Sequence, residues 1–249
     1  MKNKRLNNRS FFRSKFYDKV QMKKVGSVDD NVFVSREDSI PLEEYEFLRY
    51  VDIKLWSSIY YQITEILSIS LKTDSILEVG KGTGILGGVI KELGFSYESM
   101  DINPNLHPVH IGSVDNMPLG DNSYDIIGCF EVLEHLPYEK LTDALSELFR
   151  VANKAVIISL PNAKRIISFY LWIPRTLHKK LFIPIPFYKP SINCDDPDHR
   201  WEINRGKHSI RQIRGTLQKV ANKCDFSLVR EYRNWENSYH HFFVFHKKA

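Results

Sequence analysis

Apolar residues recur at mostly three- and four-residue steps ahead of the first strand-like segment. The series runs from Leu42 to Leu67 and includes Leu48, Leu55 and Ile63. This spacing brings apolar side chains onto one face of a helix, so it predicts one or two amphipathic helices between residues 42 and 71.

Strand-like and helix-like segments alternate from residue 75 onward. Short, largely apolar runs predict strands at 75–80, 96–101, 123–130 and 155–161. The helical period predicts helices at 84–94 and 140–152, and Gly94 predicts the end of the first. Because strands separated by helices pair in parallel through right-handed crossovers, we expect a doubly wound α/β sheet.

The end of the chain departs from this alternation. Ser209 and Gln212 have the spacing of a capping box at the start of a helix over 209–224. Two β-rich runs follow at 226–235 and 239–248, joined by a short polar turn. They predict a hairpin, so the sheet is expected to finish with an antiparallel strand.

Residues 162–207 are too long for an ordinary connection and are expected to be an insertion that roofs a ligand crevice. Its segment 165–189 mixes large apolar residues with lysines and arginines. We interpret this segment as a helical cap that buries its own apolar face. The alternatives are an amphipathic helix on a membrane surface or a wall for an apolar or lipid-linked acceptor.

The composition fits one large soluble domain with extensions. The 249 residues are 43% hydrophobic and 26% charged. Cys129, Cys194 and Cys224 lie far apart, which argues against a disulfide framework and for a reducing compartment. No apolar run has the length of a membrane span, and the start lacks the apolar centre of a secretory signal. We therefore expect a cytoplasmic protein.

The net charge of +5 is unevenly placed. Residues 1–24 hold nine lysines and arginines against one acid, Asp18. We expect a basic, flexible arm over 1–30, a helical segment over 31–73 and the main domain over 74–249. The arm could touch an anionic membrane, whereas the balanced charge elsewhere makes nucleic acid an unlikely partner.

The glycine-rich turn in "ILEVGKGTG" can be read in two registers. Starting at Gly82, the pattern G-x-G-x-x-G through Gly84 and Gly87, with Asp101 downstream, fits a dinucleotide such as NAD. Starting at Gly80, the turn has Glu78 two residues before its first glycine. That acid would repel a pyrophosphate but could help to fix the ammonium group of S-adenosylmethionine. A phosphate-binding loop is excluded, because such a loop ends in Gly-Lys-Ser/Thr and here Lys81 is followed by Gly82.

Four segments carry a family resemblance: "ILEVGKGTG", "YESMDINP", "GSVDNMPLGDNSYDIIGCFEVLEHL" and "ELFRVANKAVIISLPN". Together they resemble class I S-adenosylmethionine-dependent methyltransferases of the broad branch with an "LPF…SFD…EVLEH" signature. The resemblance covers roughly residues 74–162 and the closing helix and hairpin. It implies a Rossmann-like seven-stranded sheet, mostly parallel, with S-adenosylmethionine as cofactor.

The resemblance also implies cofactor-binding positions. These are Glu78, Gly80, Lys81 and Gly82 in the turn, Asp101 for the ribose, Ile102 beside the adenine, Ser113, Val114 and Asp115 at the adenine edge, and Phe130 and Glu131 closing the pocket. Many relatives have an aspartate where this chain has Ser113. Either Asp115 reaches the adenine amino group instead, or the backbone alone reads the adenine. Glycines 84, 87 and 88 can be explained by helix–strand packing alone.

Three residues are candidates for the catalytic chemistry. Methyl transfer to oxygen requires removal of a proton, and His135 in "EVLEHL" could act as the base or simply bond within the fold. His199 and Glu202 form a second candidate group on the proposed roof. No metal is expected, because the possible ligands are confined to residues 194–199 and the sequence offers no second group to complete a site.

The sequence therefore predicts a methyltransferase that is cytoplasmic or peripheral at a membrane and acts on a small-molecule, glycan or lipid-type acceptor at oxygen. One alternative is an NAD-dependent oxidoreductase that uses the Gly82 register. Another is a catalytically silent binding module with a methyltransferase-like fold.

Overall fold

The computed structural model describes residues 53–191, 193–194 and 198–248, which all belong to one compact unit. The predicted basic arm at 1–30 and the part of the predicted helical segment before residue 53 lie outside the described residues. Among the described residues, no helix combines the length and the apolar character that crossing a membrane requires.

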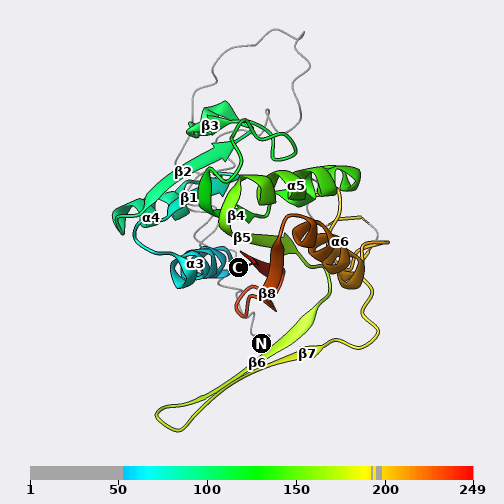
Figure 1. The fold of residues 1–249 in the computed structure, drawn as a ribbon. Coiled ribbons are helices and arrows are strands. Elements are labelled where there is room, and N and C mark those ends of the chain that lie inside the picture. The colour runs from blue at the N-terminus through cyan, green and yellow to red at the C-terminus, as the bar shows by residue number, and fades with distance from the viewer. Residues whose placement is uncertain (1–52, 192, 195–197, 249) are drawn as a thin grey trace, which may run out of the picture. The chain divides into compact units, whose positions relative to one another are not determined.

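A seven-stranded sheet forms the centre of the described unit, with strand order β3-β2-β1-β4-β5-β9-β8 (Figure 1). The strands are β1 (Ser75–Val79), β2 (Ser96–Asp101), β3 (His110–Ile111), β4 (Tyr124–Phe130), β5 (Ala152–Pro161), β8 (Phe226–Arg233) and β9 (His240–Lys247). Strands β1 to β5 pair in parallel, and β9 is antiparallel to both β5 and β8. The predicted doubly wound sheet with an antiparallel C-terminal hairpin strand is confirmed.

Helices cover both faces of the sheet (Figure 1). Helices α3 (Ile53–Ile69) and α4 (Ile85–Glu92) pack on one face, and α5 (Leu141–Val151) and α6 (Ile210–Lys223) pack on the other. Three short 3₁₀ helices, η3 (Pro104–Leu106), η4 (Leu133–His135) and η5 (Tyr138–Lys140), lie in the connections. Because both faces are covered, the central strands are largely apolar, and Ile76 and Leu77 are both fully buried.

The ends of the predicted helices are explained by their caps. Ser209 accepts a hydrogen bond from the backbone N–H of Gln212 at 3.2 Å, as the predicted N-cap of α6 requires. Gly94 follows α4 with a φ of 78°, a conformation that glycine adopts readily.

The prediction of a helical cap at 165–189 is wrong. This segment forms an antiparallel hairpin of β6 (Ile166–Ile173) and β7 (Leu177–Pro184), drawn in yellow-green in Figure 1. Its isoleucine and aromatic residues suit a pleated strand better than a helix. The turn places Arg175 at a φ of 63°, and Thr176 N–H donates to the Ile173 carbonyl at 3.1 Å.

The second half of the insertion returns to the carboxyl end of β5. Ile203 N–H donates to the Pro161 carbonyl, and Ala163 N–H donates to the Ile203 carbonyl, both at 2.9 Å. Trp201 is buried and donates its indole N–H to the Leu136 carbonyl at 3.1 Å. These contacts bring residues 198–203 next to the segment that follows β4.

Candidate active site

A cavity of about 650 Å³ opens at the carboxyl ends of β1, β2 and β4. Its walls come from α3, the glycine turn, the end of β2, the segments 112–114 and 130–136, and residues near 198 and 239. The volume lies within the range of about 300–1,000 Å³ that is usual for ligand pockets. The position also agrees with the rule that open α/β sheets bind ligands beyond the carboxyl ends of their strands.

The glycine turn presents bare backbone to this cavity. Gly80 has a φ of 85°, and a Cβ there would lie 2.3 Å from Cγ2 of Val132, so only glycine fits. Gly82 has a φ of 49° with open space around its missing side chain. A ligand can therefore approach the backbone of this turn closely.

Glu78 lies buried below the turn and lines the cavity. Burial raises the pKa of its carboxyl to about 8, and nearby Asp101 adds to the rise, while a hydrogen bond from Tyr97 and the charge of Lys81 oppose it. A cation bound at the cavity side would favour the ionised form of Glu78. The site thus fits the ammonium group of an amino-acid moiety.

Tyr97 connects this acid to the packing of α4. Its hydroxyl donates to Glu78 Oε2, and its ring lies so close to α4 that a Cβ on Gly87 would be 2.4 Å away. Gly87 therefore allows α4 to pack closely on Tyr97 of β2, in agreement with the interpretation that this glycine serves helix–strand packing. By contrast, a Cβ on Gly88 would have nothing within 4 Å.

Lys81 and Asp101 shape the neighbouring wall. The ammonium of Lys81 donates to the carbonyls of Leu106 at 2.6 Å and His107 at 2.8 Å, so it ties down the loop after β2. Asp101 Oδ1 accepts from the N–H of Asn103 at 2.9 Å. The carboxylate of Asp101 is thereby fixed at the cavity wall, where Ile102 also lies.

The predicted adenine edge is only partly at the cavity. Ser113 and Val114 line it, whereas Asp115 does not. Asp115 accepts a hydrogen bond from the Ser113 hydroxyl and lies 3.4 Å from Lys140 Nζ. The hydrogen bond from Ser113 is the main reason that the pKa of Asp115 is lowered, although burial opposes it.

Phe130 and Glu131 follow β4 and line the cavity as expected. Glu131 has a φ of 53°, which is costly for a residue other than glycine and is common at functional sites. Its Oε1 is buried and has no hydrogen-bond partner within the described part of the chain. Its Oε2 lies 3.6 Å from His240 Nε2.

The insertion brings His199 to the cavity wall, and Glu202 lies behind it. His199 Nδ1 is 3.1 Å from Glu202 Oε1, which also accepts from the Tyr239 hydroxyl at 2.8 Å. Arg205 Nε donates to Glu202 Oε2 at 2.8 Å. Burial would raise the pKa of Glu202, but these hydrogen bonds outweigh it and lower the pKa. Glu202 is fully buried and does not line the cavity.

His135 lies beside His199 on the same wall. Their rings are 5.1 Å apart and nearly perpendicular at 78°. Glu134, which the sequence interpretation did not single out, is fully buried, and its Oε1 lies 3.8 Å from His199 Nε2. One ligand-type atom from each of Glu134, His135 and His199 lies within 4.8 Å of the others.

Two further residues that bond Glu202 were missed by the sequence interpretation. Tyr239 lines the cavity and bonds Glu202, and Arg205 pairs with Glu202 from within the insertion. Neither belongs to a recognisable motif. Of the candidate metal ligands in 194–199, Asp198 and His199 line the cavity, and Asp195 and Asp196 lie outside the described residues.

A family model described as a methyltransferase domain matches residues 56–229, which is more than half of the chain. With its seven-stranded sheet of this topology, the chain belongs to the class I S-adenosylmethionine-dependent methyltransferases. S-adenosylmethionine is the cofactor of this family. This cofactor agrees with the interpretation of the glycine turn that starts at Gly80.

Solved structures with the same fold include three methyltransferases of low identity. Magnesium protoporphyrin IX methyltransferase from Synechocystis, with bound S-adenosylhomocysteine, is 13% identical over 97% of this chain and 98% of that chain, with a TM-score of 0.51. A 1,6-didemethyltoxoflavin-N1-methyltransferase from Burkholderia thailandensis is 12% identical over 84% and 85%, with a TM-score of 0.51. An S-adenosylmethionine-dependent methyltransferase from Clostridium acetobutylicum is 10% identical over 84% and 97%, with a TM-score of 0.52. No curated protein sequence matches the chain.

Proposed function

We propose that this protein transfers a methyl group from S-adenosylmethionine to a hydroxyl oxygen of a small, lipid-type acceptor. The observation that carries this proposal is the pair formed by His199 and Glu202. The imidazole of His199 lines the same cavity as the glycine turn, and the carboxylate of Glu202 fixes its orientation. Such a pair is suited to handling the proton of a hydroxyl group.

The cofactor side of the cavity would be formed by the residues around β1 and β2. Glu78 would face the ammonium group, the backbone from Gly80 to Gly82 would lie along the methionine moiety, and Asp101 would accept hydrogen bonds from the ribose. Ser113 and Val114 would contact the adenine edge through the backbone, since the Asp115 carboxylate bonds Ser113 and lies near Lys140. When bound, the cofactor supplies an electrophilic methyl group on a sulfonium.

The acceptor side would be formed by His135 and His199. Because Glu202 accepts from Nδ1–H of His199, the lone pair of that imidazole is on Nε2. An Nε2 lone pair can assist a hydroxyl acceptor by accepting its proton or by ligating a cation that lowers its pKa. Glu202 and Tyr239 are positioning residues, because they act through His199.

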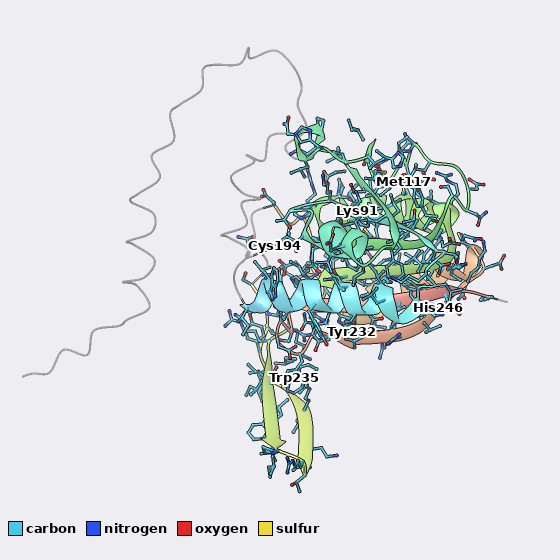
Figure 2. All side chains as sticks on the ribbon, turned by 90° about the vertical axis from the view of Figure 1, so that its left-hand side faces the viewer. Lys91, Met117, Cys194, Tyr232, Trp235 and His246 are labelled. Carbon is cyan, nitrogen blue, oxygen red and sulfur yellow. The ribbon has the colours of Figure 1, made fainter. Side chains whose placement is uncertain are left out.

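The lipid-type acceptor is supported by the β6–β7 hairpin. One face of the hairpin carries large apolar side chains that are 39–55% exposed: Ile167, Phe169, Leu171, Ile173, Leu181 and Ile183. Directly paired residues such as Phe169 and Leu181 share this face. On the other face, Phe182 packs on Trp235, which Figure 2 shows at the root of the hairpin.

The charge of the hairpin favours an anionic membrane as its partner. Residues 163–190 contain six lysines and arginines and no aspartate or glutamate. A basic, partly apolar surface of this kind binds anionic lipid through charge and through insertion of its apolar side chains. A membrane-bound hairpin would hold the enzyme where an amphiphilic acceptor is concentrated.

Calorimetric titration tests the cofactor assignment. S-adenosylhomocysteine should bind the wild-type protein, and NAD should not. Asp101→Ala should weaken binding at least tenfold, whereas Asp143→Ala, a change at an exposed acid on α5, should leave it unchanged. Binding of NAD alone would contradict the proposal, and binding of neither ligand would contradict the enzyme assignment.

Turnover with hydroxyl-bearing amphiphiles tests the reaction. Formation of S-adenosylhomocysteine should depend on a free hydroxyl and should stop when that hydroxyl is already methylated. His199→Asn should lower kcat at least a hundredfold while the affinity for S-adenosylhomocysteine changes little. Cofactor binding without turnover on any acceptor class would favour the silent binding module.

A further inference from the structure

Three side chains with metal-ligand chemistry converge at the acceptor side of the cavity. Glu134 and His135 come from η4, and His199 comes from the insertion. One ligand-type atom from each lies within 4.8 Å of the others, and Glu134 Oε1 is 3.8 Å from His199 Nε2. His135 and His199 line the cavity, so this cluster borders the space that an acceptor would enter.

The spacing is close to that of a metal site. Bonds of about 2.0–2.2 Å place two ligand atoms on one ion at most about 4.4 Å apart. Small side-chain rotations would bring all three atoms into that range. Two imidazoles and one carboxylate also leave positions open for water or a substrate oxygen.

The surroundings of His199 match the outer shell of a metal-bound histidine. Metal-bound histidines commonly donate their second ring N–H to a carboxylate, which fixes the tautomer and the ring orientation. Here Glu202 accepts from Nδ1, and Tyr239 and Arg205 in turn hold Glu202. In the neutral imidazole, the nitrogen directed at the cluster, Nε2, carries the lone pair that a metal requires.

Arg200 joins the two ligand-bearing segments through its backbone and its side chain. The N–H of Arg200 donates to the Glu134 carbonyl at 2.9 Å, and its Nε donates to the His135 carbonyl at 2.8 Å. The ligands therefore lie on segments with a fixed relation to each other, as a metal site demands. Glu134 is also fully buried, and a bound cation would stabilise its negative charge.

We infer that Glu134, His135 and His199 bind one divalent metal ion such as Fe²⁺, Co²⁺ or Zn²⁺. Imidazole ligands favour these ions over Mg²⁺ and Ca²⁺, which prefer oxygen. The open positions of the ion would bind an acceptor hydroxyl, a role that rests on the proposed function. His199 would then act on the hydroxyl through the ion, which lowers the pKa of the bound hydroxyl so that its proton can pass to water.

Cobalt binding tests this site without turnover. Full-length protein stripped with a chelator should bind one Co²⁺ per chain and develop visible ligand-field bands. Glu134→Gln and His199→Asn should each weaken Co²⁺ binding at least tenfold. Glu202→Gln should keep the bands but weaken affinity about 10–100-fold, as expected for the partner of a metal-bound histidine.

A matched control comes from another histidine–glutamate pair. His110 Nε2 lies 2.8 Å from Glu98 Oε2, and His110 is not part of the cluster. His110→Gln should bind Co²⁺ as the wild type does. Absence of Co²⁺ bands in the wild type, or an unchanged spectrum in His199→Asn, would overturn the inference.

Two further measurements separate the possible failures. Circular dichroism and S-adenosylhomocysteine binding check that each variant is folded, and His135→Asn replaces Glu134→Gln if the latter does not fold. Co²⁺ binding without S-adenosylhomocysteine binding would contradict the proposed function alone. S-adenosylhomocysteine binding without Co²⁺ binding would contradict the metal site alone.

Discussion

Two adjacent glycines of α4 are expected to respond in opposite ways to the same substitution. Gly87→Ala would place a methyl group 2.4 Å from the Tyr97 ring, which its hydrogen bond to Glu78 holds in place. We expect a loss of about 1–3 kcal/mol in the free energy of unfolding. Gly88→Ala meets nothing within 4 Å and should stabilise the helix by about 0.5–1 kcal/mol.

Urea unfolding of the two variants and the wild type measures this difference. The pair is well matched, because both changes add one methyl group to the same helix. Equal effects of the two substitutions would mean that Tyr97 does not pack against Gly87. A loss of S-adenosylhomocysteine affinity in Gly87→Ala alone would further link this packing to Glu78.

Single residues could be predicted from the sequence where a local motif determines them. The positions of Glu78 and Asp101 at the cavity follow from their places at the ends of β1 and β2. The direction of the Lys81 side chain could not be predicted, because it depends on carbonyls of a loop about 25 residues away. Glu134 is likewise buried where the insertion docks, since the Arg200 N–H donates to its carbonyl.

At the scale of elements, the hairpin should bind anionic vesicles. Phe169→Ser and Leu181→Ser, made together, remove apolar area from its exposed face, so we expect at least a tenfold loss of vesicle binding. Leu93→Ser and Val229→Ser, made together, change exposed apolar residues outside the hairpin and should have no effect.

Flotation with phosphatidylglycerol-containing vesicles measures this binding, with neutral vesicles as the second arm. Binding should weaken as salt concentration rises, because the basic residues of the hairpin are then screened. Equal binding by the two double variants would show that the hairpin is not the membrane contact. No wild-type binding at low salt would remove the membrane from the proposed function.

Elements with one clear period could be predicted, and those without one could not. The helices α5 and α6 each have one apolar face, and the period of their sequences places them correctly. The hairpin carries apolar residues on both faces, so its alternation was hidden and a helix was predicted instead. Strand β3 has two residues, which is too short to produce any pattern.

At the scale of the whole molecule, the order of strands and helices was predictable because crossover connections permit few arrangements. Only the cofactor side of the cavity could be predicted from this order of strands and helices. Its cofactor wall comes from the ends of β1 and β2, but its acceptor wall includes His199 and Tyr239, which long-range docking brings there. That docking involves backbone hydrogen bonds such as Ile203 N–H to the Pro161 carbonyl, for which the sequence carries no periodic signal.

The buried acid below the glycine turn should make the stability of the whole protein depend on pH. The pKa of Glu78 is about 8 in the folded state, against the ordinary value of 4.5. Between these values the folded state binds more protons than the unfolded state, so the free energy of unfolding falls as pH rises from about 5 to about 8. Each pKa unit corresponds to about 1.4 kcal/mol, so we expect the wild type to lose a few kcal/mol from this group.

Glu78→Gln removes the titrating group and should flatten this part of the stability profile, whereas Glu92→Gln at an exposed position should not. Denaturant unfolding at about pH 5 and about pH 8 measures the two slopes for each variant. Saturating S-adenosylhomocysteine should also flatten the wild-type slope, because its ammonium group favours the ionised Glu78 carboxylate. Parallel profiles for the wild type and Glu78→Gln would show that Glu78 titrates normally in the folded protein, and the ammonium-binding role proposed for it would lose its support.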